Sequence, residues 1–461
     1  MTARTLHAFP FVAIAIPVLL GLMLAIGYAD ANAGLGETGR AAVSLLNTGL
    51  LGNPYLIPTG PTAHVSPVHT GYLAAVFLLL GEYTHAARIA LSVVCTALWA
   101  ASTYYVLRIG QILRFGRPGM AVAILLTCLV PVYLSESVVD CRQWDQPFSA
   151  FLLIYALYRV LGREADGSLR ATVAAAVLAG VGTLLSPALL PPMLFALWFA
   201  LPRRQGYRPA FLAILVAASI MAAFLVPWGI RNAGQIGAFT MTRSNFWLEM
   251  AVGNNEQSRG DSGSSNLDAI HPFTSEPSAR TIARAGEIEF MGLMRERALA
   301  WISEHPLSFA GLSLARAVLV FFPTQGMIPW VPVLGTALAW YYYAAFGAAK
   351  LLSLLVVAAK DRNRLVWLAF TLLPLAPYTL THVNVRYLFV VFFPSACLIA
   401  FVADQAWVRL AGALRTAPGA PPGVPSNSGS ALPEATDQHR SSPTALRRAP
   451  ERRRDLVPEE R

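Results

Sequence analysis

The sequence predicts an all-α, polytopic membrane protein with about ten transmembrane helices. The first observation is composition: of the 461 residues, 55% are hydrophobic and 13% are charged, whereas soluble domains carry about 25% charged residues. The second is Ala8–Gly27, an uncharged run of 20 residues, which is long enough to cross a hydrocarbon core of about 30 Å. This run is longer than a signal-peptide core and lacks a clear cleavage site, so we expect a retained span.

Apolar runs predict the positions of the spans. We expect them at about 8–27, 84–107, 119–135, 146–162, 171–186, 188–202, 209–228, 331–357, 365–381 and 387–404. Tyr72–Gly81 is too short to cross, so we expect an interfacial or re-entrant helix. Leu307–Phe322 carries Arg316 and lies between prolines, so we expect a helix at the membrane surface.

The connecting charges predict an orientation. Four alternate loops carry three basic residues each: Arg108, Arg114 and Arg117; Arg159, Arg163 and Arg170; Arg203, Arg204 and Arg208; Lys360, Arg362 and Arg364. Under the positive-inside rule both termini are cytoplasmic, and two polar regions face outward, the loop 28–83 and a subdomain at about 229–330. Residues 1–410 form the predicted membrane body, and 411–461 a tail that we expect to be disordered in the cytoplasm.

Charge and cysteine usage argue against two other classes of protein. The net charge of +10 comes largely from arginines in short loops and the tail, which indicates membrane orientation and gives no reason to expect a nucleic-acid partner. The four cysteines are scattered, without metal-ligand spacing. They predict neither a disulfide framework nor a zinc site.

Polar residues gather at the predicted outer ends of the spans in three groups. The first contains Asp30, Glu37, Arg40, His64 and His69; the second Glu136, Asp140, Arg142 and Asp145; the third Arg231, Asn232, Arg243, Glu249, Asn254, Asn255, His382 and Arg386. Arginine can stabilise a phosphate, and a carboxylate can take a proton from a hydroxyl. These groups suit a substrate with a lipid tail, a phosphate and a sugar.

Two other interpretations apply to the same residues. A single acidic residue in a loop is more often a solvated surface charge. Transporters concentrate ionisable residues inside their spans, whereas here the predicted span interiors are nearly free of charge. The pattern therefore favours chemistry at the membrane surface over transport through the membrane.

Short segments in order along roughly residues 30–400 carry a family resemblance. They include Gly36-Glu37-Thr38-Gly39-Arg40, Asn53-Pro54-Tyr55, Gly60-Pro61-Thr62-Ala63-His64, Trp144-Asp145, Pro227-Trp228 with Arg231-Asn232, His271-Pro272 and Arg386-Tyr387. This ordered set resembles the bacterial membrane glycosyltransferases related to dolichyl-phosphate-mannose–protein mannosyltransferases, family 39 of the GT-C fold. The resemblance implies a GT-C-like body in the bacterial plasma membrane with an outward-facing active site.

The resemblance also implies an activity and its residues. The expected reaction is inverting transfer of a hexose or pentose from a polyprenyl-phosphate-linked sugar to an acceptor hydroxyl. The family often has an Asp-Glu pair that acts as base; here Gly36 takes the first position, so Glu37 is the expected base, with Asp30 in reserve. Arg386, Arg231 and Arg40 are the expected contacts to the donor phosphate. The expected substrate contacts are Glu136, Asp140, Asp145, His64, Arg243 and Asn254.

Several points stay open from the sequence. No metal ligand is assigned, although a divalent cation near the second acidic group is left open. The alternatives to an enzyme are a transporter or flippase for a lipid-linked glycan, and an inactive assembly partner. The acceptor is unassigned and could be a glycan, a lipid or a protein.

Overall fold

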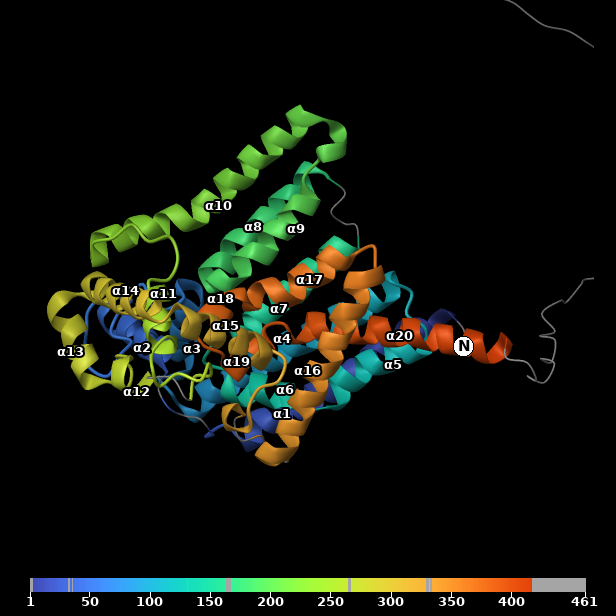
Figure 1. Ribbon diagram of the computed structural model, residues 1–461, viewed down its shortest axis with the longest axis horizontal. Helices are drawn as coiled ribbons and strands as arrows, with labels where there is room; N and C mark the ends of the chain where they lie inside the picture. The colour runs from blue at the N-terminus through green and yellow to red at the C-terminus, as the bar shows by residue number, and fades with distance from the viewer. Residues whose placement is uncertain are drawn as a thin grey trace, which may run out of the picture. The chain divides into compact units, whose positions relative to one another are not determined.

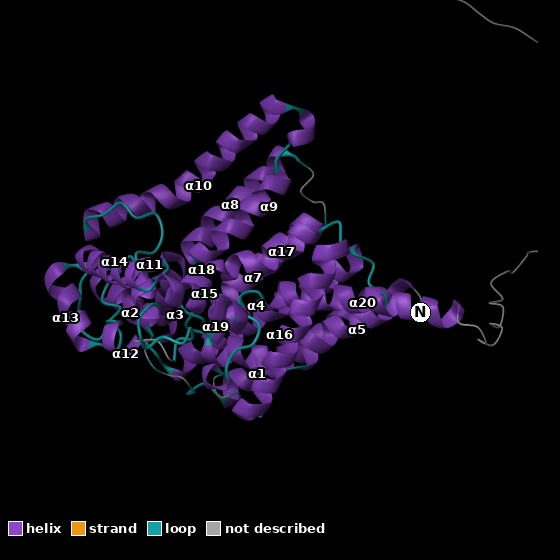
Figure 2. Cartoon of the chain, in the orientation of Figure 1, coloured by secondary structure: helices purple, strands orange, loops and turns teal. Residues whose placement is uncertain are grey.

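The computed structural model describes residues 3–31, 34, 36–130, 132–162, 167–263, 267–328, 331 and 334–416. Its regular structure in these ranges is helical, and two isolated bridges pair Gly52 with Pro61 and Asp261 with Val383 (Figure 2). Residues Met1–Leu410 form one compact unit. Of the tail predicted to be disordered, 411–461, residues 411–416 form the end of a helix, and the rest lies outside the described residues.

The predicted spans all correspond to apolar helices. Five stretches are long and apolar enough to cross a membrane: α4 (His85–Ile112), the run Arg117–Asp140, α10 (Tyr207–Ile236), α16 (Gly335–Lys360) and α20 (Phe392–Thr416). Five predicted spans correspond to shorter apolar helices, namely α1 (Ala3–Gly27), α7 (Gln146–Leu161), α8 (Leu169–Leu185), α9 (Leu190–Ala200) and the run from α17 (Arg364–Leu372) to α18 (Ala376–Leu380). The prediction of an all-α, multi-span membrane protein is confirmed.

The two segments that we expected not to cross are short helices. They are α3 (Pro67–Leu80) and α15 (Pro306–Leu319), both apolar and below the length of the five long stretches. The Ser66 hydroxyl caps α3 by accepting from the His69 amide at 3.2 Å, and Pro67 occupies the first turn, where no intrahelical donor is needed. The helix therefore begins five residues before the predicted Tyr72.

Three predicted spans are interrupted. The run Arg117–Asp140 consists of α5 (Arg117–Ile124), a π-helical turn (Leu125–Leu129), α6 (Val132–Ser135) and a second π-helical turn (Glu136–Asp140). The predicted span 365–381 breaks at a 3₁₀ turn, Leu373–Leu375, beside Pro374 and Pro377, because proline cannot donate to the helical ladder. The last predicted span, 387–404, is divided between the end of a separate short helix, α19 (Val385–Phe389), and α20, which begins at Phe392.

The second π-helical turn corrects one prediction. Glu136 and Asp140 were expected in a loop between spans, and that expectation is wrong: both lie in the helical run, and Glu136 is buried. The Tyr343 hydroxyl of α16 donates to the Glu136 carboxylate in a short contact. A buried carboxylate is tolerated where it accepts such a hydrogen bond.

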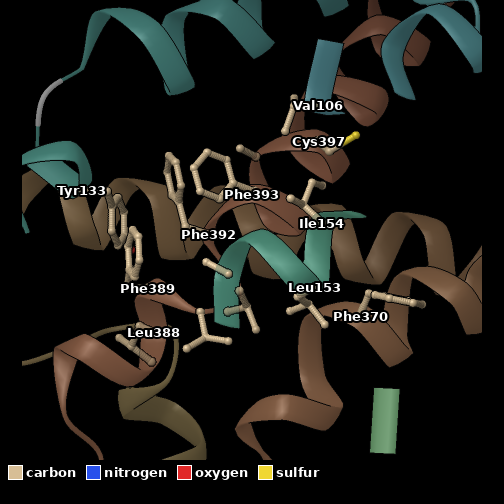
Figure 3. Packing of buried hydrophobic residues seen from close by; sticks show 14 of the residues in the cluster. Val106, Tyr133, Leu153, Ile154, Phe370, Leu388, Phe389, Phe392, Phe393 and Cys397 are labelled. Atoms are coloured by element: carbon tan, nitrogen blue, oxygen red, sulfur yellow. The ribbon is translucent and has the colours of Figure 1, made fainter. Parts of the chain in front are cut away.

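An aromatic core fixes the last two helices. Trp99 of α4 packs its ring 4.8 Å from Phe393 and 5.2 Å from Phe392, and Tyr133 lies 4.4 Å from Phe392, measured between centroids. Figure 3 shows Leu153 of α7 and other aliphatic side chains beside these rings. Aromatic pairs contribute roughly 0.5–1.5 kcal/mol each beyond their buried area. Phe389 of α19 joins this core with its ring 6.1 Å from that of Trp99, so the core also positions α19 and Arg386 near its start.

The region that the sequence predicts to face outward contains a small helical subdomain. It contains α11 (Phe246–Gly253), α12 (Leu267–Ile270), α13 (Glu276–Ala285) and α14 (Glu287–Glu304). The helices α13 and α14 follow each other with one break at Gly286, whose φ is +90°. Tyr55, from the loop after α2 (Glu37–Thr48), lies in the same hydrophobic cluster as Leu248 and Phe290. This cluster joins the first polar loop to the subdomain, whose helices α11, α12, α13 and α14 are grouped together in Figure 1.

Candidate active site

Glu37 lies at the first turn of α2, in the wall of a polar cavity. The cavity has a volume of about 420 Å³, and Glu37 is 9% exposed. Gly36 is the N-cap of the helix and has extended backbone. The Glu37 carboxylate therefore lies at the helix N-terminus, where the first backbone amides have no partner within the helix. That position favours a negative charge, because the helix dipole is positive there.

Two imidazoles hold one oxygen of this carboxylate. His64 Nε2 lies 3.1 Å and His271 Nε2 lies 3.5 Å from Glu37 Oε1. Tyr55 packs edge-on against both rings, at centroid distances of 5.3 Å and 6.4 Å. Because both contacts fall on Oε1, the described side-chain contacts leave Oε2 available to a ligand in the cavity.

The imidazoles determine the charge of Glu37. Burial alone would raise the pKa of its carboxyl, but the nearby His64, His271 and Arg386 outweigh burial and lower the pKa to about 2. Burial also opposes charge on His64, yet the Glu37 carboxylate raises the pKa of that imidazole. For His271 burial dominates and the pKa is lowered. The carboxylate is therefore ionised at physiological pH.

The same three side chains could hold a metal ion. Glu37, His64 and His271 each offer one ligand atom, and these atoms lie within 4.8 Å of one another. Two imidazoles and a carboxylate form a donor set that suits zinc. The site is compatible with the divalent cation that the sequence left open, although the residues differ from the second acidic group considered there.

Two arginines line the cavity, with different partners. Arg243 Nη2 lies 2.9 Å from Asp145 Oδ2 and donates to the Leu185 carbonyl at 2.7 Å. The guanidinium of Arg386 lies 4.1 Å from the ring centroid of Trp144 and 5.4 Å from that of Tyr387. Among the described residues no carboxylate forms an ion pair with Arg386, and its Nε lacks a hydrogen-bond partner. Arg386 is thus the cation left to meet an anion.

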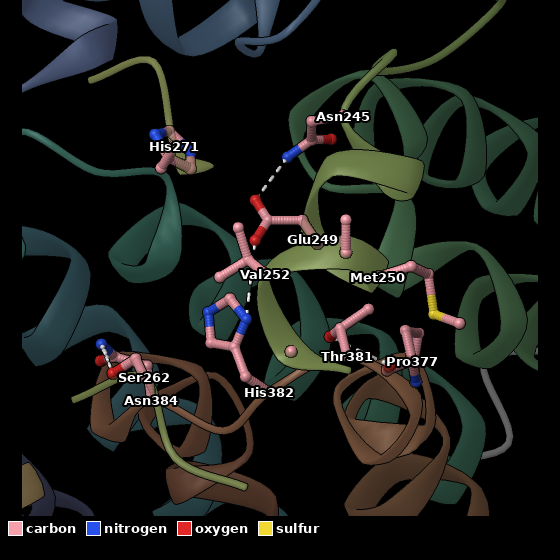
Figure 4. A network of polar contacts seen from close by, with 12 residues as sticks. Asn245, Glu249, Met250, Val252, Ser262, His271, Pro377, Thr381, His382 and Asn384 are labelled. Carbon is pink, nitrogen blue, oxygen red and sulfur yellow. Dashed lines mark hydrogen bonds and ion pairs between the residues drawn. The ribbon is translucent and has the colours of Figure 1, made fainter. Parts of the chain in front are cut away.

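A third acidic residue, Glu249 of α11, also lines the cavity. Its carboxylate accepts a hydrogen bond from Asn245 Nδ2 at 3.0 Å and lies 3.7 Å from His382 Nδ1 (Figure 4). His382 is buried, and burial lowers the pKa of its imidazole. The contact joins the subdomain of α11–α14 to the stretch between α18 and α19.

A second cavity lies beyond Trp144 and Arg386. Its volume is about 550 Å³, and Trp144 and Arg386 line both cavities. Glu136 and Asp140 line the second cavity, whereas Asp145, which the sequence placed in the same group, lines the first. A Cβ atom on Gly36 would lie 3.3 Å from Trp144 Cζ2. The indole therefore occupies the space next to Gly36, where the family that the sequence resembles often has its first acid.

Four predicted site residues lie elsewhere. The side chain of Asp30 is 70% exposed, contacts Arg88 and His85, and lines neither cavity. The other three hold backbone carbonyls: Arg231 donates to Thr62 and Leu51 at 2.7 Å each, Arg40 to Tyr55 at 2.6 Å, and Asn254 to Leu380 at 2.9 Å. In this structure they position the polar loop and the subdomain.

Three residues of the site received no role from the sequence. His271 follows α12, and its contact to Glu37 joins segments far apart in the chain. Glu249 is one of several acidic residues with helical spacing. Trp144 has the appearance of an interfacial tryptophan. The segment His271-Pro272 and the Trp144-Asp145 pair were part of the family resemblance, which was the available signal for two of them.

The fold and this cavity define a multi-span helical membrane protein with a buried polar site. No protein-family model and no curated protein matches the chain, so membership of family 39 stays a resemblance. Among solved structures, the chain is similar to the archaeal oligosaccharyltransferase AglB from Archaeoglobus fulgidus in complex with an inhibitory peptide and a dolichol-phosphate. That similarity has a TM-score of 0.48 at 15% identity, covering 90% of this chain and 52% of that one.

Two further structures of an oligosaccharyltransferase from Archaeoglobus fulgidus match over similar lengths. The complex with Zn and sulfate gives a TM-score of 0.45 at 16% identity, covering 87% of this chain and 50% of that one. The form tethered to an acceptor peptide with the NVT sequon gives 0.49 at 14% identity, covering 88% and 51%. This chain spans about half the length of those proteins, and their activity is not carried over to it.

Proposed function

We propose that this protein is a glycosyltransferase of the bacterial plasma membrane. It transfers a hexose or pentose from a polyprenyl-phosphate donor to an acceptor hydroxyl at the outer face, with inversion at the sugar and both termini in the cytoplasm. The observation that supports this most is the pairing, in one cavity, of an ionised carboxylate, Glu37, with a guanidinium that has no carboxylate partner, Arg386.

The cavity offers groups for each part of such a donor. Arg386 would bind the phosphate, because a guanidinium presents paired donors to phosphate oxygens. Tyr378 and Tyr387 stack at 4.0 Å between centroids in the cavity wall and would offer an aromatic surface to the sugar. Pro187, Ala188 and Phe246 form an apolar part of the wall, which suits the first carbons of a lipid tail.

The reaction would proceed by direct displacement. Glu37 Oε2 takes the proton of the acceptor hydroxyl, and that oxygen forms a bond to the anomeric carbon on the face opposite the phosphate. The bond from the anomeric carbon to the phosphate oxygen breaks, and its electron pair leaves with the polyprenyl phosphate. Arg386 stabilises the added charge on the leaving group. A carboxylate with a lowered pKa stays ionised and accepts the proton late, once the attacking oxygen has become acidic.

A divalent cation would give Glu37 a second role. His64, His271 and Glu37 would hold it, and it would supply a fixed positive charge at the N-terminus of α2. A carboxylate that coordinates a metal ion is a weaker base, so the rate of sugar transfer should be measured with and without the metal ion. If the cation has a structural role, dialysis against EDTA should lower the thermal midpoint of the purified protein, and ZnCl₂ should restore it. An unchanged midpoint would exclude a bound structural cation.

Glu37→Gln tests the base. The variant should fold, should bind undecaprenyl phosphate in nanodiscs as the wild type does, and should transfer no sugar when given a polyprenyl-phosphate donor. Glu82→Gln is the matched control, because Glu82 is exposed and lines neither cavity. Near-normal transfer by Glu37→Gln together with an inactive Asp30→Asn would assign the base to Asp30.

The transporter alternative has one observation in its favour. Lys350 is buried inside α16, and an ionisable residue within a span is a typical feature of transporters. However, its Nζ donates to the Val320 carbonyl at 2.9 Å, at the end of α15, and lies 4.6 Å from the ring centroid of Phe321. Lys350 thus has a structural explanation. Release of free polyprenyl phosphate from donor by the purified protein would exclude transport without chemistry.

A further inference from the structure

Residues 381–384 lead from α18 into α19, and Arg386 is the second residue of that helix. Because α18 ends at Leu380 and α19 begins at Val385, these residues lie outside the helices and must be held by other contacts. The proposed function assigns the donor phosphate to Arg386, so the contacts that hold this stretch also bear on the proposed site.

The subdomain of α11–α14 supplies several of these contacts. The Val383 amide donates to the Gly260 carbonyl at 3.0 Å, and the Val383 carbonyl accepts from the Ser262 amide at 3.0 Å. Nearer to α18, Asn254 Nδ2 donates to the Leu380 carbonyl at 2.9 Å. These hydrogen bonds attach the backbone before α19 to the segment between α11 and α12 and to the end of α11.

The side chain of Asn384 extends this attachment to Arg386. Asn384 is the N-cap of α19, and its Oδ1 accepts from the Arg386 amide at 3.1 Å. Its Nδ2 donates to Ser262 Oγ at 2.9 Å (Figure 4). An asparagine amide accepts at one end and donates at the other. These two partners therefore select one orientation of the side chain, and they join the subdomain to the backbone of Arg386.

The cap matters because α19 is short. The helix has five residues, and a helix of this length is marginal without contacts from outside. The guanidinium of Arg386 lies 4.1 Å from the ring centroid of Trp144 and 5.4 Å from that of Tyr387. Aromatic faces attract a cation without directing its N–H groups. The position of the Arg386 backbone therefore helps to set where the guanidinium reaches in the cavity wall.

We propose that Asn384 and Ser262 are positioning residues for Arg386, through which the subdomain sets the contact to the donor phosphate. The inference rests on the proposed function, in which Arg386 binds that phosphate. With Asn384 bonded at both ends, the first turn of α19 is held and the guanidinium meets the phosphate at one place. Without the cap, the guanidinium has a wider range of positions and binds the phosphate less tightly.

Binding of undecaprenyl phosphate and of undecaprenol, measured on the full-length protein in nanodiscs by native mass spectrometry, isolates the phosphate contact. The two lipids have the same tail, so the ratio of their affinities reports on the phosphate. Asn384→Ala should lower this ratio by about fivefold, and Ser262→Ala should lower it by about threefold. Asn384→Ser keeps a capping oxygen and should lower the ratio less than Asn384→Ala does.

Ser168→Ala is the matched control. Ser168 caps α8 by accepting from the Ala171 amide at 3.1 Å, and it lines neither cavity. This variant loses a cap of the same kind and should keep the wild-type ratio. An equal fall of the ratio in Ser168→Ala and Asn384→Ala would overturn the proposal, since the loss would then follow from lower stability alone.

The combination of two substitutions tests whether Asn384 and Ser262 act together. Because both act through the same hydrogen bond, Asn384→Ala with Ser262→Ala should lower the ratio no further than Asn384→Ala alone. Ser262 is only partly buried, so Ser262→Ala should fold and keeps the proposal testable if Asn384→Ala does not. A wild-type ratio in Ser262→Ala would show that the subdomain does not set the phosphate contact.

Arg386→Gln separates this proposal from the proposed function. It should lower the ratio by about tenfold or more, and an unchanged ratio would overturn both proposals. A lowered ratio in Arg386→Gln, with wild-type ratios in Asn384→Ala and Ser262→Ala, would keep the phosphate contact and reject the positioning residues. A ratio that depends on Asn384, together with no transfer from any polyprenyl-phosphate donor, would keep the positioning residues and reject the glycosyltransferase.

Discussion

Glu287 should stabilise the polar loop that carries His64. It is the first residue of α14 and is buried, and its carboxylate accepts three hydrogen bonds. Ala63 N donates at 2.9 Å and Ser244 Oγ at 2.6 Å, and the Thr62 hydroxyl makes a short third contact. These donors come from the first polar loop and from the segment before α11. One side chain therefore joins the loop to the subdomain.

The magnitude follows from these contacts. Hydrogen bonds to a charged group contribute roughly 1.5–3 kcal/mol each, and disruption of a buried charged network costs about 3–5 kcal/mol. The loop keeps a second attachment, since Arg231 donates to the Thr62 and Leu51 carbonyls. We therefore expect Glu287→Gln, which keeps the shape and loses the charge, to lower the free energy of unfolding by about 2–4 kcal/mol.

The measurement is the thermal midpoint of detergent-solubilised protein, followed by size-exclusion chromatography after heating. At roughly 2 °C per kcal/mol, the midpoint should fall by about 4–8 °C. Glu289→Gln is the control, because Glu289 is exposed on the same helix and should change the midpoint by less than about 1 °C. A Glu287→Gln midpoint equal to that of Glu289→Gln would refute the account of the loop.

Two further predictions concern other buried charges. In protein dialysed against EDTA, the ionised Glu37 should stabilise the fold above its unfolded pKa of 4.5, and this stabilisation should be lost as the pH falls from there toward about 2. Glu37→Gln should remove this part of the pH dependence of the thermal midpoint. Identical pH profiles for the variant and the wild type would contradict the lowered pKa. Arg316→Lys should destabilise the protein by about 2–3 kcal/mol, because Arg316 donates to Asn254 Oδ1 and the Leu380 carbonyl at 3.0 Å each and to the Gly253 carbonyl. The control Arg297→Lys, at an exposed position of α14, should leave the thermal midpoint unchanged. Equal midpoints for the two variants would show that a lysine ammonium can replace the guanidinium of Arg316.

The helices were predictable because the membrane limits the choices. A chain crossing hydrocarbon must satisfy its backbone within helices, so the length of each apolar run was enough to locate the spans. The interruptions of the predicted spans were harder to predict from the sequence. Pro374 and Pro377 are visible in the sequence, whereas the hydrogen bond that Tyr343 of a distant helix donates to Glu136 in the π-helical turn is not.

The site was predictable only in part, because its contacts join distant segments. Glu37, Arg386 and Arg243 were nominated and share one cavity. His271 was not, since no spacing relates it to Glu37. Arg231 resembled a phosphate ligand because it is a cation at the end of a span, but it donates to the backbone carbonyls of Thr62 and Leu51. Carbonyl acceptors carry no sequence signal, so such a role appears only in the folded chain.

The packing of Gly36 against Trp144 makes the two positions interdependent. A side chain at residue 36 would require the indole to move, and a smaller residue at 144 would leave Arg386 without its stacking partner. Gly36→Asp alone should therefore lower the free energy of unfolding, and adding Trp144→Ala to that variant should restore part of the loss. The changes that the two substitutions cause in the free energy of unfolding should then be non-additive in a double-mutant cycle. An acid at position 36, as the resembled family often has, would therefore require an accompanying adjustment of Trp144.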